Sequence, residues 1–244
     1  MAISTNSIIH YTESFDVLCK ILDEGFKIKY CLENLSLISK GKGSSAAHPM
    51  VSFCDIPLSE TNKHFESYGC YGIGLYKEWA LRNGLNPVLY IEKNSSIAIS
   101  LSNMLQKVRD GSLADIEKDI YRLKAFTKNY SGELHTNNID VLEYRFYNEK
   151  EWRFIPQRQE INGKTISVSG SKYKADKQLY NNKLSNIRLK FTPLDISYII
   201  VKNTDEIPRL ISYLKDKYYD KCTAKDLDIL LTKICSVEQI QSDY

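Results

Sequence analysis

The sequence has little net charge. Its 33 Lys and Arg side chains nearly balance its 30 Asp and Glu side chains, which leaves a formal net charge of +3. Charges of both signs are interspersed along the chain, so the composition does not indicate the basic footprint of a nucleic-acid-binding protein. Nucleic-acid recognition stays open as an alternative only through the lysine-containing segments 122–130 and 172–183.

The sequence also lacks a targeting or membrane segment. The first residues, MAISTNSIIHYTESF, have neither the basic start nor the long apolar run of a signal peptide. No apolar window reaches the length of a membrane span. We therefore expect a cytoplasmic protein that has no membrane partner.

Metal-site spacing is absent as well. The six cysteines have no CxxC spacing, and the four histidines are scattered along the chain. A structural zinc site needs paired ligands. We therefore expect free thiols and no bound metal.

The glycine-rich stretch YGCYGIGL (68–75) is not a nucleotide-binding loop. It has neither the GxGxxG pattern that follows a strand nor the GK[ST] ending of a phosphate loop. Its glycines more simply allow close approach of the backbone. NAD binding by those two routes is excluded.

Tyrosine is the abundant residue, with 17 copies. Tyrosine joins an apolar body to a polar tip, which suits a groove for a flat polar ligand or for another protein. A tyrosine-rich β core explains the same count. Composition leaves both interpretations open.

Strand-like and helix-like periods alternate along the chain, which predicts a single α+β domain over residues 1–244. We expect its core at about 7–95 and 140–205, a helical insertion at about 96–130, and C-terminal helices at about 206–240. Local signals place the individual elements. They predict strands at 7–12, 50–58 and 86–93, a helix between Ser14 and Gly25, a short helix capped by Ser59, two helices broken at Gly111, a helix with Pro208 in its first turn, a helix capped by Thr223, and a mobile loop from Ser36 to Pro49.

Two glutamates stand two positions apart in NEKEWRFIP (148–156). On a strand, Glu149 and Glu151 would share one face with Arg153, and Trp152 would point to the core. Adjacent carboxylates repel each other, so at least one pKa should rise unless Arg153 or a ligand offsets the repulsion. A catalytic carboxylate can be tuned in this way, although a solvated strand face carries the same pattern.

The segment His10-Tyr11-Thr12 ends the first predicted strand. A histidine at the end of a strand can bind a ligand. A histidine that packs in the core is the more ordinary interpretation of an isolated case.

The order of these segments resembles a known family. HYT (10–12), ILDEGF (21–26), VSFCDIPLS (51–59), YGIGLYKEWALRNGLNPVLYI (71–91) and NEKEWRFIP (148–156) together resemble the bacterial abortive-infection family AbiGi. That family is described as the antitoxin partner of a phage-resistance system. The resemblance implies phage defence and a cognate toxin, antitoxin or phage component as partner.

A more remote resemblance, to ADP-ribosyltransferase-type folds such as the DarT-like toxins, implies a mechanism. It implies a mixed β core with flanking helices, and NAD as the substrate that donates ADP-ribose to a nucleic-acid or protein acceptor. VSFCD (51–55) departs from the Ser-Thr-Ser middle motif of such folds, since it holds only one serine. Carried over residue by residue, the resemblance assigns NAD contacts to His10, Tyr11, Thr12 and Arg153, the middle-strand hydroxyl to Ser52, stacking on nicotinamide to Tyr68 or Tyr71, catalysis to Glu151, and the first acid of the pair to Glu149.

Two hypotheses about function follow. In the first, the protein is an NAD-dependent ADP-ribosyltransferase, and His10, Glu151 and one of the two tyrosines converge in one cleft. A carboxylate in that cleft would stabilise the oxocarbenium-like charge that forms when the glycosidic bond of NAD breaks. In the second, the protein is a non-catalytic binding partner whose cleft is filled by its own side chains.

Overall fold

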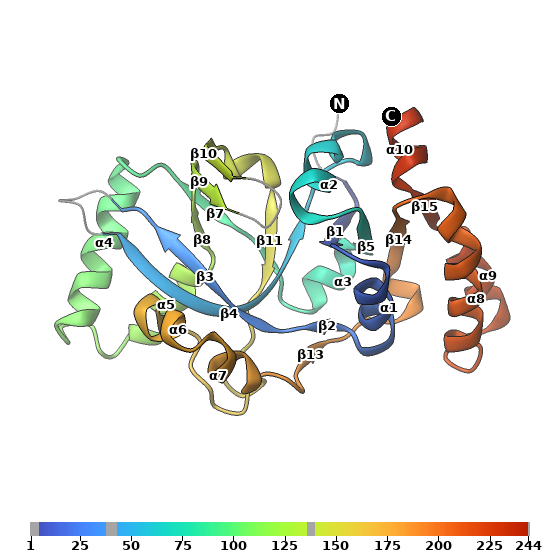
Figure 1. Cartoon of the computed structure of the whole chain (residues 1–244). Coiled ribbons are helices and arrows are strands. Elements are labelled where there is room, and N and C mark those ends of the chain that lie inside the picture. The colour runs from blue at the N-terminus through green and yellow to red at the C-terminus, as the bar shows by residue number, and fades with distance from the viewer. Residues whose placement is uncertain (1–4, 38–42, 136–139, 244) are drawn as a thin grey trace.

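A nine-stranded sheet forms the centre of the protein in the computed structural model, which describes residues 5–37, 43–135 and 140–243 (Figure 1). Strand order across the sheet is β15-β14-β5-β1-β4-β11-β6, and β3 and β12 also pair with β4. Only β14 and β15 are parallel among these described pairs. The strands of this sheet are β1 (Ser7–Thr12), β3 (Lys29–Leu35), β4 (Ser44–Cys54), β5 (Tyr71–Tyr76), β6 (Asn86–Pro87), β11 (Glu151–Phe154), β12 (Val168–Ser169), β14 (Ile196–Val201) and β15 (Ile234–Ser236).

Three small two-stranded pairings lie beside this sheet. One of them, the parallel pair of β7 and β8, contains Lys128. The pairs are β2 (Phe26–Lys27) with β13 (Arg188–Leu189), β7 (Leu89–Ile91) with β8 (Thr127–Asn129), and β9 (Gly132–His135) with β10 (Asp140–Tyr144).

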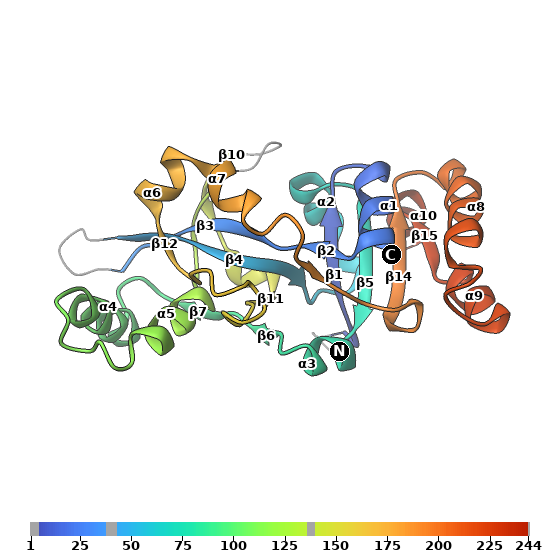
Figure 2. The same ribbon diagram turned by 90° about the horizontal axis from the view of Figure 1, so that it is seen from below.

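Helices cover both sides of the sheet. Figure 2 shows α4 and α5 on one side of β3 and β4 and α6 and α7 on the other, while α8, α9 and α10 flank the end formed by β14 and β15. The helices are α1 (Phe15–Glu24), α2 (Asn62–Tyr68), α3 (Lys77–Arg82), α4 (Ser96–Arg109), α5 (Glu117–Ala125), α6 (Gly170–Ala175), α7 (Lys177–Asn182), α8 (Ile207–Tyr218), α9 (Ala224–Leu231) and α10 (Val237–Asp243), with 3-10 turns η1 (Leu58–Glu60), η2 (Phe146–Glu149), η3 (Pro193–Asp195) and η4 (Thr204–Glu206). None of the helices in the described ranges combines the length and the apolar character needed to cross a bilayer.

Helix α1 forms where its local signals predict it. The Ser14 side chain accepts a hydrogen bond from the Val17 backbone N–H, which satisfies one of the free donors at the helix start. Gly25 ends the helix at φ 84°, a conformation that is costly for residues with a Cβ. The buried face packs on the sheet through Phe15, Leu18, Ile21 and Leu22.

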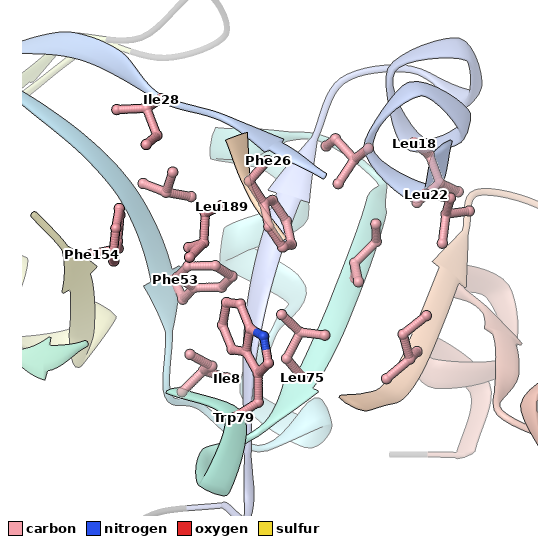
Figure 3. Close-up of a cluster of buried hydrophobic side chains, with 14 of the residues drawn as sticks. Ile8, Leu18, Leu22, Phe26, Ile28, Phe53, Leu75, Trp79, Phe154 and Leu189 are labelled. Atoms are coloured by element: carbon pink, nitrogen blue, oxygen red, sulfur yellow. The ribbon is translucent and has the colours of Figure 1, made fainter. Parts of the chain in front are cut away.

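The main core lies on the α1 side of the sheet (Figure 3). Rings from three different elements meet at its centre: Phe26 lies 5.0 Å from Phe53, and Phe53 lies 5.6 Å from Trp79. Trp79 is buried, and its indole N–H donates to the Lys190 backbone carbonyl over 3.1 Å. This aromatic cluster packs β4 against β2 and α3, and therefore sets which side chains of β4 point to the other side.

Strand β4 joins the two ends of the sheet because its two halves have different partners. Residues 44–50 pair with β3, whereas residues 51–54 pair with β11, and Cys54 is opposite Ile9 of β1. The predicted loop from Ser36 to Pro49 is therefore wrong over residues 44–49, and residues 38–42 lie outside the described residues. Small residues hid this strand, because its pairing depends on β3 and not on an alternating pattern of its own.

Most predicted elements are confirmed, with changes at their ends. The helices on either side of Gly111 are α4 and α5, Pro208 lies in the first turn of α8, and Thr223 caps α9. Thr61 and not Ser59 precedes α2. The predicted strand at 86–93 divides into β6 and β7, which pair with different partners. The α+β class is confirmed, and the finer ADP-ribosyltransferase-like core stays a prediction.

Candidate functional site

The two glutamates of NEKEWRFIP lie on either side of a sharp turn. Glu149 ends η2, Lys150 has the left-handed conformation at φ 44° and ψ 51°, and Glu151 begins β11. The prediction that both glutamates lie on one strand is therefore wrong. The turn nevertheless directs both carboxylates into the same buried region, where Glu149 is 3% exposed and Glu151 is 5% exposed.

Lys128 of β8 joins the two carboxylates. Its Nζ lies 2.8 Å from Oε2 of Glu149 and 3.0 Å from Oε2 of Glu151. The same ammonium lies 4.6 Å from the centre of the Phe146 ring. One cation thus offsets two carboxylates that would otherwise repel each other.

Glu151 has further donors on its own strand and on β4. Ser52 Oγ donates to Oε1 over 2.6 Å, and Arg153 donates through Nε to Oε1 over 2.6 Å and through Nη2 to Oε2 over 3.0 Å. This arrangement follows from strand register, since Arg153 is paired opposite Ser52 and side chains of Glu151 and Arg153 leave β11 on the same face. The prediction that Glu151 and Arg153 share one face of the strand is confirmed.

Arg153 is fully buried and uses its remaining donors outside the strand. Nη1 donates to the backbone carbonyl of Ala125 at the end of α5 over 2.8 Å, and Nη2 lies 3.1 Å from Oε1 of Glu33 on β3. The guanidinium therefore ties β11 to β3 and to the helical segment. Its geometry suits this role, because a guanidinium offers five donors in a fixed plane.

Two tyrosine hydroxyls make further hydrogen bonds to the two glutamates. Tyr68 of α2 donates its hydroxyl to Oε1 of Glu149. The Tyr90 hydroxyl accepts the Glu151 backbone N–H over 2.8 Å. We call this set the buried ion cluster, and its members are Glu33, Ser52, Tyr68, Tyr90, Lys128, Glu149, Glu151 and Arg153.

The ion cluster keeps its groups charged in spite of burial. Burial by itself would raise the pKa of Glu151, but Arg153 and Lys128 outweigh it and hold the pKa below its ordinary value of 4.5. Burial would likewise lower the pKa of Lys128, and Glu151 and Glu149 outweigh it and raise the pKa. Burial and the neighbouring Glu149 raise the pKa of Tyr68, so this hydroxyl remains a donor at neutral pH. The offset by Arg153 that the sequence analysis allowed for therefore holds for Glu151, and Lys128 adds to it.

His10 lies on the opposite face of the sheet. Its ring packs edge-on against Phe26 at 5.1 Å and against Phe53 at 5.6 Å, in the main core. Its Nδ1 donates to the Ser52 backbone carbonyl over 2.8 Å, and burial lowers its pKa, so the ring is neutral. Because Phe53 and Ser52 are adjacent on β4, their side chains point to opposite faces. The predicted convergence of His10 and Glu151 in one cleft is wrong.

The other predicted cofactor contacts are also divided between the two faces. Tyr71 is paired opposite Thr12, on the face of His10, and its hydroxyl donates to Oε1 of Glu206 over 2.9 Å. Tyr11 points to the other face and packs against Phe65. The structure therefore brings together Ser52, Tyr68, Glu149, Glu151 and Arg153, and it separates them from His10, Thr12 and Tyr71.

Sequence reasoning did not predict Lys128 or Tyr90 as members of the site. Lys128 belongs to the segment 122–130, where its charge indicated only weak contact with nucleic acid. The one local signal was the glutamate pair itself, since two buried carboxylates need a cation. That signal does not say which lysine supplies it.

The geometry limits what the ion cluster can do chemically. A carboxylate acts as a general base or stabilises an oxocarbenium ion only if the substrate reaches it. Glu151 already accepts hydrogen bonds from Ser52, Arg153 and Lys128, and it is 5% exposed. A substrate hydroxyl would have to displace one of these donors. The cluster as it stands holds β11, β4, β3 and β8 together.

Comparisons with known proteins agree on one family. A family model described as "Putative abortive phage resistance protein AbiGi, antitoxin" matches residues 24–202, a range that includes every member of the ion cluster. The abortive phage resistance protein AbiGi of Lactococcus lactis subsp. cremoris is 27% identical over 247 residues, which cover 90% of this chain and 99% of that protein. No solved structure matches the chain.

Proposed function

This chain belongs to the AbiGi family of abortive phage resistance proteins, and from that premise we propose that it is a non-catalytic antitoxin that binds a cognate toxin. The observation that carries the proposal is the closed ion cluster. The carboxylates of Glu149 and Glu151 are buried and accept hydrogen bonds from donors of the same chain, which supports a role in the fold. A protein of this kind acts through its surface.

Two measurements test the proposal. The chain is co-expressed with the toxin encoded beside it, and growth and co-elution in size-exclusion chromatography are recorded. We expect the chain to restore growth and to elute with the toxin as one complex. Rescue of growth by a chain that never elutes with the toxin would contradict the proposal.

A folded variant separates binding from catalysis. Glu151→Gln keeps the size of the side chain and removes its charge, and circular dichroism identifies a temperature at which the variant is still folded. At that temperature we expect growth rescue equal to that of the wild type. Loss of rescue by a folded Glu151→Gln chain would favour a catalytic role. Glu66→Gln, an exposed glutamate on α2, is the matched control for the loss of one negative charge.

NAD-dependent transfer of ADP-ribose to a nucleic-acid or protein acceptor is the second candidate. One observation favours it: several residues to which the resemblance gives roles in binding or cleaving NAD lie together in the ion cluster, namely Ser52, Tyr68, Glu149, Glu151 and Arg153. The position of His10 on the other face speaks against it. The test is release of nicotinamide from NAD by the wild-type chain, with and without the toxin. Release that disappears in folded Glu151→Gln would establish this candidate in place of the first.

A further inference from the structure

Two adjoining cavities lie away from the ion cluster, and residues at the start of β1 and of β14 line the first of them. Their volumes are about 280 Å³ and about 420 Å³, and both are lined by Leu58, Ser197 and Tyr198. Helix α10 lines the larger one and also contacts η1. Each volume is close to or within the range of small-molecule sites, roughly 300 to 1,000 Å³.

A β-bulge places Ser197 in the wall of both cavities. Ile196 pairs with Leu75 and Tyr198 pairs with Gly74, so Ser197 is the extra residue between two consecutive pairs. Gly74 makes the bulge possible, because a Cβ at that position would lie 2.8 Å from Ser197 Oγ and 3.1 Å from Tyr198 Cδ2. A glycine opposite a bulge thus leaves room for one particular hydroxyl.

That hydroxyl has no hydrogen-bond partner among the residues that the structure describes. Ser197 is 6% exposed, and its Oγ is a buried atom that makes no hydrogen bond. Buried hydroxyl groups are normally paired, and an unpaired one that lines a cavity indicates a missing partner. A ligand atom that accepts or donates a hydrogen bond would pair with the Ser197 hydroxyl.

The charged and aromatic side chains that line the two cavities indicate the chemistry of the ligand. Lys233 donates from Nζ to the Ile196 carbonyl over 2.6 Å and lies 5.2 Å from the centre of the Tyr76 ring, which leaves two of its N–H donors for other partners. None of the described residues that line the two cavities carries a carboxylate. Tyr76 and Tyr198 present half-exposed rings beside this cation, at 36% and 37% exposure. An anion would meet Lys233, and a planar ring would stack on a tyrosine.

We propose that the two cavities form one binding site for a small ligand that combines a planar ring with an anionic group. The anion binds Lys233, the ring packs against Tyr198 or Tyr76, and a polar atom of the ligand pairs with Ser197 Oγ. Such a ligand is either a mononucleotide or an aromatic carboxylate. The site lies on β14 and α10 and shares no residue with the ion cluster, so it stands independently of the proposed binding of a toxin.

Titration calorimetry on the full chain tests the site with four probes. AMP and indole-3-acetate each carry a ring and an anion, whereas adenosine lacks the anion and inorganic phosphate lacks the ring. We expect AMP or indole-3-acetate to bind, with an affinity that falls as salt rises, and we expect adenosine and phosphate to bind more weakly. Which of the two complete probes binds identifies the source of the ligand. Absence of binding by both, or equal binding of adenosine and AMP with none of indole-3-acetate, would overturn the proposal.

Three variants link binding to the named residues. Ser197→Ala removes the unpaired hydroxyl, so we expect the melting temperature of this variant to be no lower than that of the wild type. The Kd for the ligand should rise roughly tenfold, which corresponds to the loss of one hydrogen bond. Lys233→Gln should weaken binding by a similar factor and remove most of its salt dependence. Lys215→Gln, on α8 and exposed, is the matched control and should bind as the wild type does. Unchanged affinity in both Ser197→Ala and Lys233→Gln would place the ligand elsewhere and overturn the proposal.

Discussion

Lys128 Nζ lies 3.0 Å from Glu151 Oε2 in the interior of the protein, although the two residues belong to strands that do not pair with each other. β8 pairs with β7, whereas β11 pairs with β4 and β6. The contact therefore joins the small β7–β8 pair to the main sheet. Glu151 is buried and the Lys128 side chain is 15% exposed, so the contact is largely shielded from water and helps both groups to remain charged.

Replacement of Lys128 by Met should destabilise the fold strongly. It removes the cation that Glu149 and Glu151 share, so Glu151 keeps Arg153 as its ion-pair partner. Removal of one partner from a buried ion pair costs about 3 to 5 kcal/mol. Urea denaturation followed by circular dichroism measures the loss.

Lys118→Met is the control for this change, since Lys118 is exposed on α5. It should alter the free energy of unfolding by no more than about 0.5 kcal/mol. Equal effects of the two substitutions would show that the ion cluster does not stabilise the fold.

Glu151 should make stability depend on pH in the acid range. Its pKa in the folded protein lies below the ordinary value of 4.5, so its contribution is complete above pH 4.5 and is lost as the pH falls through the folded pKa. The free energy of unfolding of the wild type should therefore exceed that of Glu151→Gln most at neutral pH. We expect this difference to narrow steadily below pH 4.5 in urea titrations.

Salt provides a second check on that pH dependence. A buried ion pair is screened far less than an exposed one, so raised ionic strength should leave the difference at pH 7 nearly unchanged. A difference between wild type and Glu151→Gln that stayed constant from pH 7 to pH 3 would contradict the assigned direction of the pKa shift.

Tyr71 and Glu151 should behave as independent sites, because they lie on opposite faces of the sheet. In a double-mutant cycle, Tyr71→Phe and Glu151→Gln should change the free energy of unfolding additively, within about 0.5 kcal/mol. Ser52→Ala with Glu151→Gln is the matched control, since Ser52 Oγ donates to Glu151 over 2.6 Å and these two changes should couple. Strong coupling of Tyr71 with Glu151 would revive the idea of a shared cleft.

The two tryptophans should differ in their effect on stability. Trp79 is 1% exposed and packs against Phe26 and Phe53, so Trp79→Ala should cost about 3 to 5 kcal/mol. Trp152 is half-buried at the margin of the core, and its N–H donates to Asp55 over 3.3 Å. Trp152→Ala should cost clearly less.

Chemical denaturation of the two tryptophan variants measures this difference, with Trp79→Phe and Trp152→Phe as conservative controls. A larger loss in Trp152→Ala than in Trp79→Ala would contradict this prediction.

Local signals in the sequence were sufficient for several helices. Ser14 and Gly25 bound α1 and Thr223 caps α9, because each cap satisfies backbone groups within a few residues of itself. Pro208 lies in the first turn of α8, where its missing N–H is not needed. The same reasoning did not find β3 or residues 44–49 of β4. Strand pairing satisfies the backbone through a partner, and the small residues at 44–47 carry no alternation of their own.

Spacing along the chain was enough to predict the α+β class, the main helices and the common face of Glu151 and Arg153. Only the tertiary structure decided that Lys128 joins the two glutamates and that His10 faces the other way. The face of a strand residue depends on register with strands distant in sequence, and a shift of one residue exchanges the two faces. That register placed the glutamates of NEKEWRFIP in a closed ion cluster.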